Sequence, residues 1–119
     1  MTEEDKNLLI QDLCARLPYN IKVWHEDGIF NIDSISSIYG EIHLDIIDNY
    51  TIDVSEVKPY LFPLSSMTEE QKKEEYEICK YYLNGYESKL IDFYNKNHLD
   101  YRDLISKGLA IDATNLNIY

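Results

Sequence analysis

The chain has 119 residues, the size of one domain and long enough to bury a hydrophobic core without disulfides or a structural metal. Apolar residues make up 45% and charged residues 28%, and there are only 4 glycines and 3 prolines, which excludes collagen-like and disordered classes. The net charge of −11, from 22 acidic residues against 11 lysines and arginines, argues against direct binding to nucleic acid or to an anionic membrane.

The first predicted element is an amphipathic helix over 3–17. Thr2 can cap its start, and acidic residues fill the first turn, where the helix dipole favours negative charge. Pro18 ends the pattern. Apolar residues recur at helical spacing on one side of this helix, namely Leu9, Ile10, Leu13, Cys14 and Leu17.

After residue 20 the pattern changes to the alternation typical of strands. Alternating segments lie around 21–24, 30–33, 41–46 and 50–54. Asp27-Gly28 is a hairpin signal and Asp48-Asn49 is a turn signal. These segments predict a four-stranded antiparallel meander, whose length would let it curl toward a small open barrel.

The remaining chain is predicted to be helical after an extended segment. Pro59 and Pro63 keep residues 58–64 extended. We expect this extended segment to leave the sheet and to direct the next helix back over the sheet. The next helix starts at the capping box Thr68-Glu69-Glu70-Gln71 and runs to about Leu83. Further helices are expected at 87–97 and 100–107, the last capped by Asp100. The predicted fold is therefore α+β: one domain over 1–119 with an N-terminal helix, the meander, and two or three C-terminal helices on one face of the sheet.

The N-terminal residues, the apolar runs and the cysteines indicate in which cellular compartment the protein is expected. The first residues lack the basic and apolar segments of a signal peptide, and no apolar run approaches the ~20 residues of a membrane span. We therefore expect a cytoplasmic protein that does not contact a membrane. Cys14 and Cys79 have no metal-type spacing, so we expect both to be buried and reduced, with a disulfide between their helices as the alternative.

Negative charge is concentrated in the strand region. Eight of the 22 acidic residues lie between Lys22 and Lys58, and that interval contains no lysine or arginine. One interpretation is a solvated outer face that keeps the sheet from pairing edge to edge. The other is a negative surface that docks onto a basic partner. The residues predicted for that contact are Glu41, Asp45, Asp48, Asp53 and Glu56.

Candidate catalytic groups are sparse. His43 and Asp45 share a predicted strand face, but a catalytic zinc typically takes three protein ligands. The sequence has no phosphate-binding loop, dinucleotide fingerprint or nucleophile elbow. We therefore expect no enzymatic activity, no metal and no cofactor, and a small hydrolase built around His43 or His98 ranks last among the hypotheses.

Tyrosine is frequent, with 11 in the chain. Helical spacing predicts that Tyr76, Tyr82 and Tyr94 are in or near the core. Tyr81 and Tyr86 fall on outer positions, where an aromatic side chain can anchor a partner.

Two stretches, 58–70 and 93–110, carry specific strings: KPYLFPLSSMTEE and FYNKNHLDYRDLISKGLA. Together they resemble a family of small proteins found in phages and mobile elements of gut anaerobes. That family usually has arginine where Phe62 stands, phenylalanine at Leu99 and glycine at Asp103. No activity is assigned to the family, so no functional residue can be transferred from it. The resemblance implies only a phage-like setting, in which an accessory or counter-defence role is expected.

Two hypotheses for function follow. The first is a non-enzymatic interaction module whose acidic strand region binds a basic host protein, so that neutralising Asp45, Asp48 and Asp53 together would weaken binding. The alternative is a binder of a small metabolite or signalling nucleotide in a pocket between helices and sheet. Such a pocket would need local positive charge, for which the candidates are Lys58, Arg102 and Lys107. The oligomeric state is left open.

Overall fold

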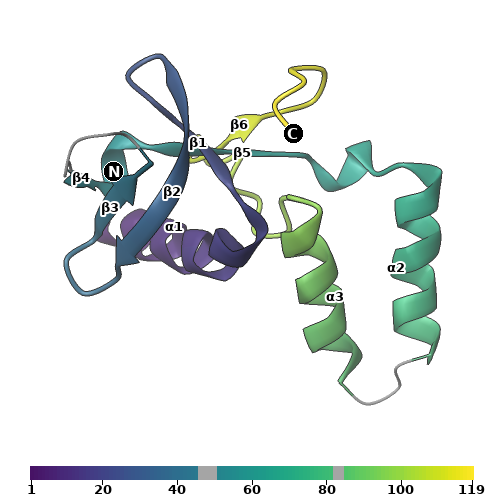
Figure 1. The fold of residues 1–119 in the computed structure, drawn as a ribbon. Coiled ribbons are helices and arrows are strands. Elements are labelled where there is room, and N and C mark those ends of the chain that lie inside the picture. The colour runs from purple at the N-terminus through teal and green to yellow at the C-terminus, as the bar shows by residue number, and fades with distance from the viewer. Residues whose placement is uncertain (46–50, 82–84) are drawn as a thin grey trace.

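The computed structural model of the chain describes residues 1–45, 51–81 and 85–119. The helices are α1 (Glu3–Arg16), α2 (Glu69–Tyr81) and α3 (Tyr86–Lys96). The strands are β1 (Lys22–His25), β2 (Gly28–Ser36), β3 (Glu41–Leu44), β4 (Thr51–Asp53), β5 (Lys58–Leu61) and β6 (Ile111–Asp112). The fold class is α+β, as predicted, with α1 against the strands and the α2–α3 pair beyond one end of them (Figure 1).

The sheet contains the predicted meander but is larger than predicted. Its order is β4-β3-β2-β1-β5-β6, with β5 antiparallel to β1 and β6 parallel to β5. The prediction of four strands was therefore wrong in number and order, and the six-stranded sheet is open rather than closed into a barrel. The extended segment at 58–61 does not leave the sheet, because the backbone of β5 pairs with β1. β6 has only two residues, too few for an alternation pattern to be visible in the sequence.

The β1–β2 hairpin turns one residue earlier than predicted. His25 pairs with Gly28, so Glu26 and Asp27 form the turn, with φ of 45° and 62°. Positive φ at both central residues is the geometry that matches the twist of a two-residue hairpin. Gly28 belongs to β2, where a Cβ would come within 2.6 Å of the Phe30 ring. A larger residue at position 28 would therefore require the Phe30 ring to move, whereas the turn itself does not use the glycine.

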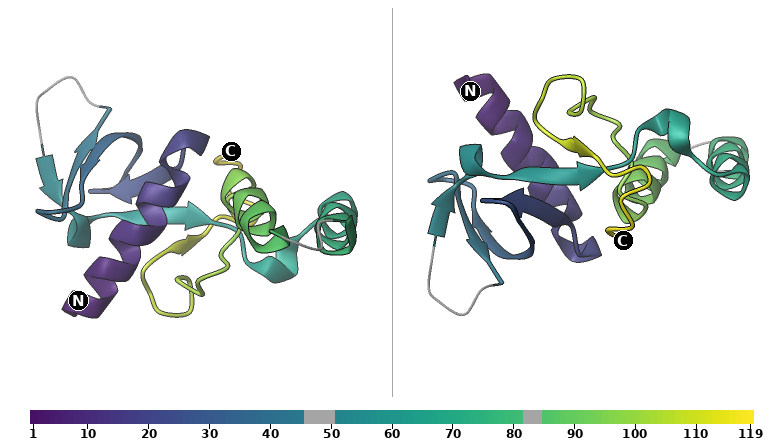
Figure 2. Two further views of the ribbon diagram at one scale, coloured as in Figure 1. Left: turned by 90° about the horizontal axis from the view of Figure 1, so that it is seen from below. Right: turned by 90° about the horizontal axis from the view of Figure 1, so that it is seen from above.

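The core lies between α1 and one face of the sheet. Figure 2 shows α1 running across the strands when the molecule is seen from below, and the strands in front of α1 when it is seen from above. Leu9 and Leu13 of α1 are fully buried against core side chains from β1 to β5. Each such leucine contributes about 1.5–3 kcal/mol of burial energy. Thr2 caps α1 as predicted, since its Oγ1 accepts a hydrogen bond of 3.1 Å from the Asp5 backbone N–H.

The α2–α3 pair stands at one end of the molecule (Figure 1). The predicted capping box is confirmed: Thr68 N–H donates to Gln71 Oε1 at 3.0 Å and Gln71 N–H donates to Thr68 Oγ1 at 3.1 Å. The predicted end at Leu83 lies outside the described residues. α2 has no fully buried residue and packs on α3, so it does not cover the sheet as predicted. Its half-buried residues form one narrow stripe, which can pack against only one neighbouring element. These residues are Gln71, Glu75 and Ile78.

The predicted helix over 100–107 is a series of turns instead. Asp100 does hold the segment, because its carboxylate accepts hydrogen bonds from the Leu104 and Ile105 backbone N–H groups at 2.8 and 2.9 Å. Asp103, however, has φ of 60°, which interrupts a right-handed helix. This segment leads into buried Leu109 and Ala110 and then into β6.

Three side chains expected in the core are exposed. Cys14 and Cys79 are both exposed and free, and Tyr76 is 64% exposed. The burial of the cysteines was therefore predicted wrongly, and the alternative disulfide is not formed. Cys14 is outside because the buried stripe of α1 consists of Leu9, Asp12, Leu13 and Arg16. Tyr76 is outside because α3 covers only one side of α2.

Candidate functional site

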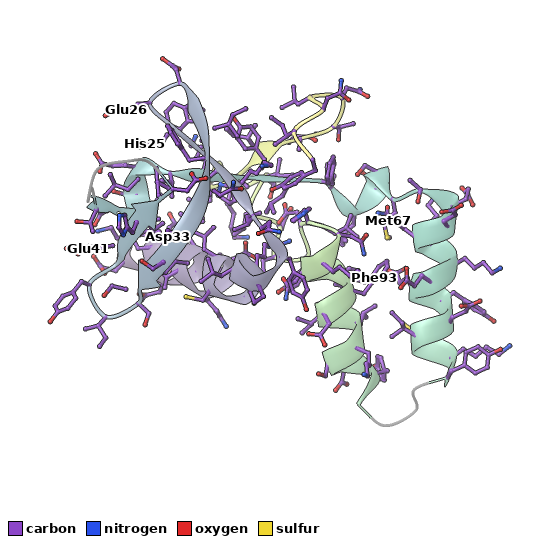
Figure 3. All side chains as sticks on the ribbon, in the orientation of Figure 1. His25, Glu26, Asp33, Glu41, Met67 and Phe93 are labelled. Carbon is purple, nitrogen blue, oxygen red and sulfur yellow. The ribbon has the colours of Figure 1, made fainter. Side chains whose placement is uncertain are left out.

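Exposed carboxylates are spread over the sheet part of the molecule. Glu26 lies in the β1–β2 turn, at the opposite end of β2 from Glu41. These two residues and Asp33 lie away from α2 and α3, whereas Met67 and Phe93 lie between those two helices (Figure 3). Within the described part of residues 23–57 no lysine or arginine offsets them. We call this set the acidic strand surface; it consists of Glu26, Asp27, Asp33, Glu41, Asp45 and Glu56.

Three of the predicted contact residues also hold the backbone. The Asp45 carboxylate accepts hydrogen bonds from the Asn31 backbone N–H at 2.9 Å and from Asn31 Nδ2 at 3.1 Å. Asp53 caps the 3-10 turn η2 (Val54–Glu56) and pairs with Lys6 Nζ at 3.3 Å. Hydrogen bonds from Ser55, helped by Lys6, hold the pKa of Asp53 below its ordinary value. Glu56 completes the capping box of η2 while remaining exposed, and Asp48 lies outside the described residues.

A cluster of buried charges lies beneath the sheet, and sequence reasoning missed it. Asp12 and Arg16 of α1 are both fully buried and form a bidentate pair, with Arg16 Nε at 2.9 Å and Nη2 at 3.2 Å from the Asp12 oxygens. Arg16 Nη2 also donates to the Leu99 carbonyl at 2.7 Å, and Arg102 Nε lies 3.4 Å from Asp12 Oδ1. Burial raises the pKa of Asp12, and the two guanidinium groups oppose that shift. The available signal was the Asp-x-x-x-Arg spacing on the same helix face as Leu9 and Leu13.

Tyr101 joins this cluster to the neighbouring helix. Its ring centroid lies 5.2 Å from Arg16 Cζ and 4.8 Å from Arg102 Cζ, and the ring stacks on Tyr94 at 5.5 Å. Its hydroxyl donates to Asn95 Oδ1 at 2.9 Å. The cluster therefore fastens the segment after α3 to α1, and the Arg102 guanidinium is already engaged in this contact.

The two stretches that carry the family resemblance lie against each other. Phe62 N–H donates to the His98 carbonyl and Asp100 N–H donates to the Phe62 carbonyl, both at 2.8 Å. A groove of about 400 Å³ runs beside this junction. It is lined by Pro63, Leu64, Ser65, Asp100, Tyr101, Asp103, Ile105 and Ser106.

This groove does not contain the bases predicted for ligand binding. Its charged lining residues are Asp100 and Asp103, and Lys58, Arg102 and Lys107 are absent from its described lining. Lys58 is exposed on β5 and Lys107 is exposed in the turns after Asp103. The structure thus does not gather the three predicted bases at the groove, whose charge is unfavourable for a phosphate or another anion.

The other predicted residues lie as follows. Tyr81 is 67% exposed, with Lys80 Nζ 5.4 Å from its ring centroid, whereas Tyr86 is half-buried. His43 Nδ1 lies 3.8 Å from Asp33 rather than beside Asp45, whose carboxylate is bound to Asn31.

Across residues 1–45, 51–81 and 85–119, no three His, Cys, Asp or Glu side chains come together as metal ligands. In the same residues, no helix is long and apolar enough to cross a membrane.

His98 is the interior group with the largest consequence for pH dependence. Its ring stacks on Tyr119, with centroids 3.8 Å apart and planes 13° apart, and its Nδ1 is buried without a hydrogen bond. Burial, with the positive charges of Arg16 and Lys22 nearby, lowers the pKa of His98 from 6.5 to about 4. The imidazole is therefore neutral in the folded protein at neutral pH.

We expect acid to destabilise the fold through His98. The unfolded chain takes up this proton near pH 6.5 but the folded protein only near pH 4, so stability is unaffected above 6.5 and falls as pH drops toward 4. The full change in pKa corresponds to about 3.4 kcal/mol, and because solvent screens this half-buried ring the expected loss over this interval is about 2 kcal/mol. Urea unfolding at several pH values should show that loss in the parent and not in His98→Asn, a variant that tolerates the φ of 57° at this position. An equal loss in the variant would assign the effect to other groups.

Comparison with protein families, curated proteins and solved structures finds no match to this chain.

Proposed function

We propose that this protein is a non-enzymatic protein-binding module whose acidic strand surface docks a basic partner. In the phage setting that the resemblance implies, the partner would be a basic host protein of the cytoplasm, such as one that normally grips phosphates. Such a role is that of an accessory or counter-defence protein.

The observation that supports this proposal most is the one-sided distribution of charge. Residues 23–57 contain eight acids and no lysine or arginine, whereas the rest of the chain has fourteen acids and eleven lysines and arginines. Three exposed members of this set, Glu26, Asp33 and Glu41, lie in the sheet part of the molecule, away from α2 and α3 (Figure 3). A surface of one sign steers an oppositely charged protein toward itself and suppresses unsuitable partners.

The interior groups support a binding role rather than a catalytic one. The Asp12–Arg16 pair fastens the segment after α3, the Asp100 carboxylate holds a turn, and His98 is stacked against Tyr119. Each of these ionisable groups is engaged in holding the fold.

A charge-neutralising variant tests the proposal. Glu26→Gln/Asp33→Asn/Glu41→Gln removes three exposed charges without disturbing the hydrogen bonds that Asp45 and Asp53 make. Its matched control, Glu70→Gln/Glu74→Gln/Glu77→Gln, removes the same charge from exposed positions of α2. Binding to an immobilised lysine peptide should weaken about tenfold in the first variant, because each exposed ion pair contributes about 0.5 kcal/mol.

Binding of the α2 control should weaken much less, and raised salt should reduce the difference. Equal affinity of the two variants would contradict the proposal, because it would show that only net charge matters. A pull-down from host lysate, washed at increasing salt and repeated with both variants, would then identify the natural partner.

The alternative, a binder of a small metabolite or nucleotide, has less support. The groove beside Asp100 has an acidic lining, and Arg102 is paired with Asp12. A nucleotide that raises the melting temperature of the protein by itself would favour this alternative.

A further inference from the structure

Residues 114–119 form a surface segment that Tyr119 fixes to the rest of the fold. After β6 the chain loops outward and returns toward β5 (Figure 1), and residues 114–117 are exposed. Within the described residues, the hydrogen bonds of this segment other than those of Tyr119 stay within 112–116. The Tyr119 hydroxyl, in contrast, bonds two strands that are distant in the sequence. The segment can therefore move away when one side chain leaves its site.

The Tyr119 hydroxyl fills the position of a backbone pair between β1 and β5. Val23 of β1 pairs with Pro59 of β5, so the next pair along the two strands would be Lys22 with Tyr60. The pairing of the strands stops before that pair, and the hydroxyl bridges its two backbone groups. The Lys22 N–H donates to the hydroxyl at 3.0 Å, and the hydroxyl donates to the Tyr60 carbonyl at 2.8 Å. One hydroxyl thus satisfies a backbone donor and a backbone acceptor.

Two rings complete this site. The Tyr119 ring stacks on His98, with centroids 3.8 Å apart, and is tilted against Phe62, with centroids 5.8 Å apart. Tyr119 is 42% exposed, so a ring in this position is accessible from solvent. We call this the Tyr119 site; it consists of the Lys22 N–H, the Tyr60 carbonyl, and the rings of Phe62 and His98. A phenol ring fits all four groups, whereas an aliphatic alcohol or a plain aromatic ring uses only two of them.

We propose that the Tyr119 site binds a tyrosine side chain of a partner protein, and that segment 114–119 occupies the site as its internal competitor. The ring that the site already holds defines the chemistry of the occupant. Tyrosine is also among the residues that contribute most to binding at protein interfaces. The contact is separate from the acidic strand surface, so this inference goes beyond the proposed function. A partner must displace Tyr119, which lowers its apparent affinity.

The first measurement asks whether the site takes a phenol ring from solution. Tyr119→Ala vacates the site, and the probes are phenol and benzene, which differ only in the hydroxyl. At about ten times its Kd, phenol should raise the melting temperature of Tyr119→Ala by about 4 °C and leave that of the parent nearly unchanged. Phenol should bind about fivefold more tightly than benzene, because it adds the two hydrogen bonds. Tyr39→Ala, at a tyrosine that is 74% exposed in the β2–β3 turn, is the matched control and should gain nothing.

The second measurement asks whether Tyr119 competes with a tyrosine from another chain. The probes are the blocked peptides NLNIY, which has the sequence of residues 115–119, and NLNIF. NLNIY should bind Tyr119→Ala about tenfold more tightly than it binds the parent, because in the parent it must displace Tyr119. NLNIF should bind Tyr119→Ala about fivefold more weakly than NLNIY, since it lacks the hydroxyl.

The opposite results overturn the inference. If neither phenol nor NLNIY binds Tyr119→Ala, the site is only a structural contact within the chain. Equal binding of NLNIY and NLNIF would show that the hydroxyl is not recognised, and equal binding of NLNIY to the parent and to Tyr119→Ala would show that the segment does not compete. Dimers of the parent that are lost in Tyr119→Ala would assign the site to a second copy that exchanges this segment.

The test remains decisive if Tyr119→Ala is unfolded by itself. The same probes are then read through refolding, which phenol should restore and benzene should not. Absence of refolding with phenol would contradict the inference. None of these measurements depends on the binding of lysine peptides by the acidic strand surface, so failure of this inference and failure of the proposed function are distinguishable.

Discussion

Replacing Arg16 with methionine is expected to lower the free energy of unfolding by about 3–5 kcal/mol, the cost of leaving a buried charge without its partner. Arg16→Met leaves the fully buried Asp12 carboxylate without its bidentate partner and the Leu99 carbonyl without a donor. Urea unfolding followed by Trp24 fluorescence measures the loss. For a domain whose total stability is about 5–15 kcal/mol, this change alone should bring the protein close to unfolding.

The double variant Asp12→Leu/Arg16→Met is the control for this prediction. Replacing a buried ion pair by apolar residues is often neutral, so the double variant should be clearly more stable than Arg16→Met. Arg102, whose side chain is 17% exposed, is then left near the surface rather than in the core. If Arg16→Met lowers the free energy of unfolding by less than about 1 kcal/mol, water must reach the Asp12 carboxylate. The buried cluster would then be hydrated.

Replacing Tyr119 is expected to lower the free energy of unfolding through the hydrogen bonds and ring contacts that it makes. The hydroxyl of Tyr119 lies between two strands, where it accepts a hydrogen bond from the Lys22 N–H at 3.0 Å and donates one to the Tyr60 carbonyl at 2.8 Å. Its ring packs on His98 and on Phe62. Burial raises the pKa of Tyr119, so the hydroxyl stays protonated at neutral pH.

A two-step series separates these contributions. Tyr119→Phe removes only the hydrogen bonds and should cost about 1 kcal/mol, whereas Tyr119→Ala also removes the ring contacts and should cost about 2 kcal/mol, less than a fully buried aromatic because Tyr119 is 42% exposed. Thermal unfolding measures both, with Tyr39→Ala as the control at a tyrosine that is 74% exposed. Equal losses for Tyr119→Phe and Tyr119→Ala would show that the ring stacking contributes little.

The acidic strand surface shows how far sequence reasoning reaches at the site. Alternation with Ile42 correctly placed Glu41 on the outer face of its strand. The structural uses of Asp45 and Asp53 could not be predicted in this way, because they depend on Asn31 and Lys6, which other elements bring close. For the same reason the lysine of β5 could not be recognised as a neighbour of Trp24 before the pairing of β5 with β1 was known.

Local signals in the sequence determined the elements whose partners are close along the chain. Thr2 and Pro18 marked α1, alternation marked the meander, and the Thr68–Gln71 capping box marked the start of α2, because each signal acts over a few residues. The tertiary structure alone decided which polar residues became interior. Asp12 and Arg16 are buried, whereas Cys14, on the predicted apolar stripe, is exposed. The Arg16 guanidinium can be buried because the carbonyl of Leu99, 83 positions farther along the chain, accepts a hydrogen bond from it. Contacts of such sequence separation leave no periodic trace, so only the folded chain reveals them.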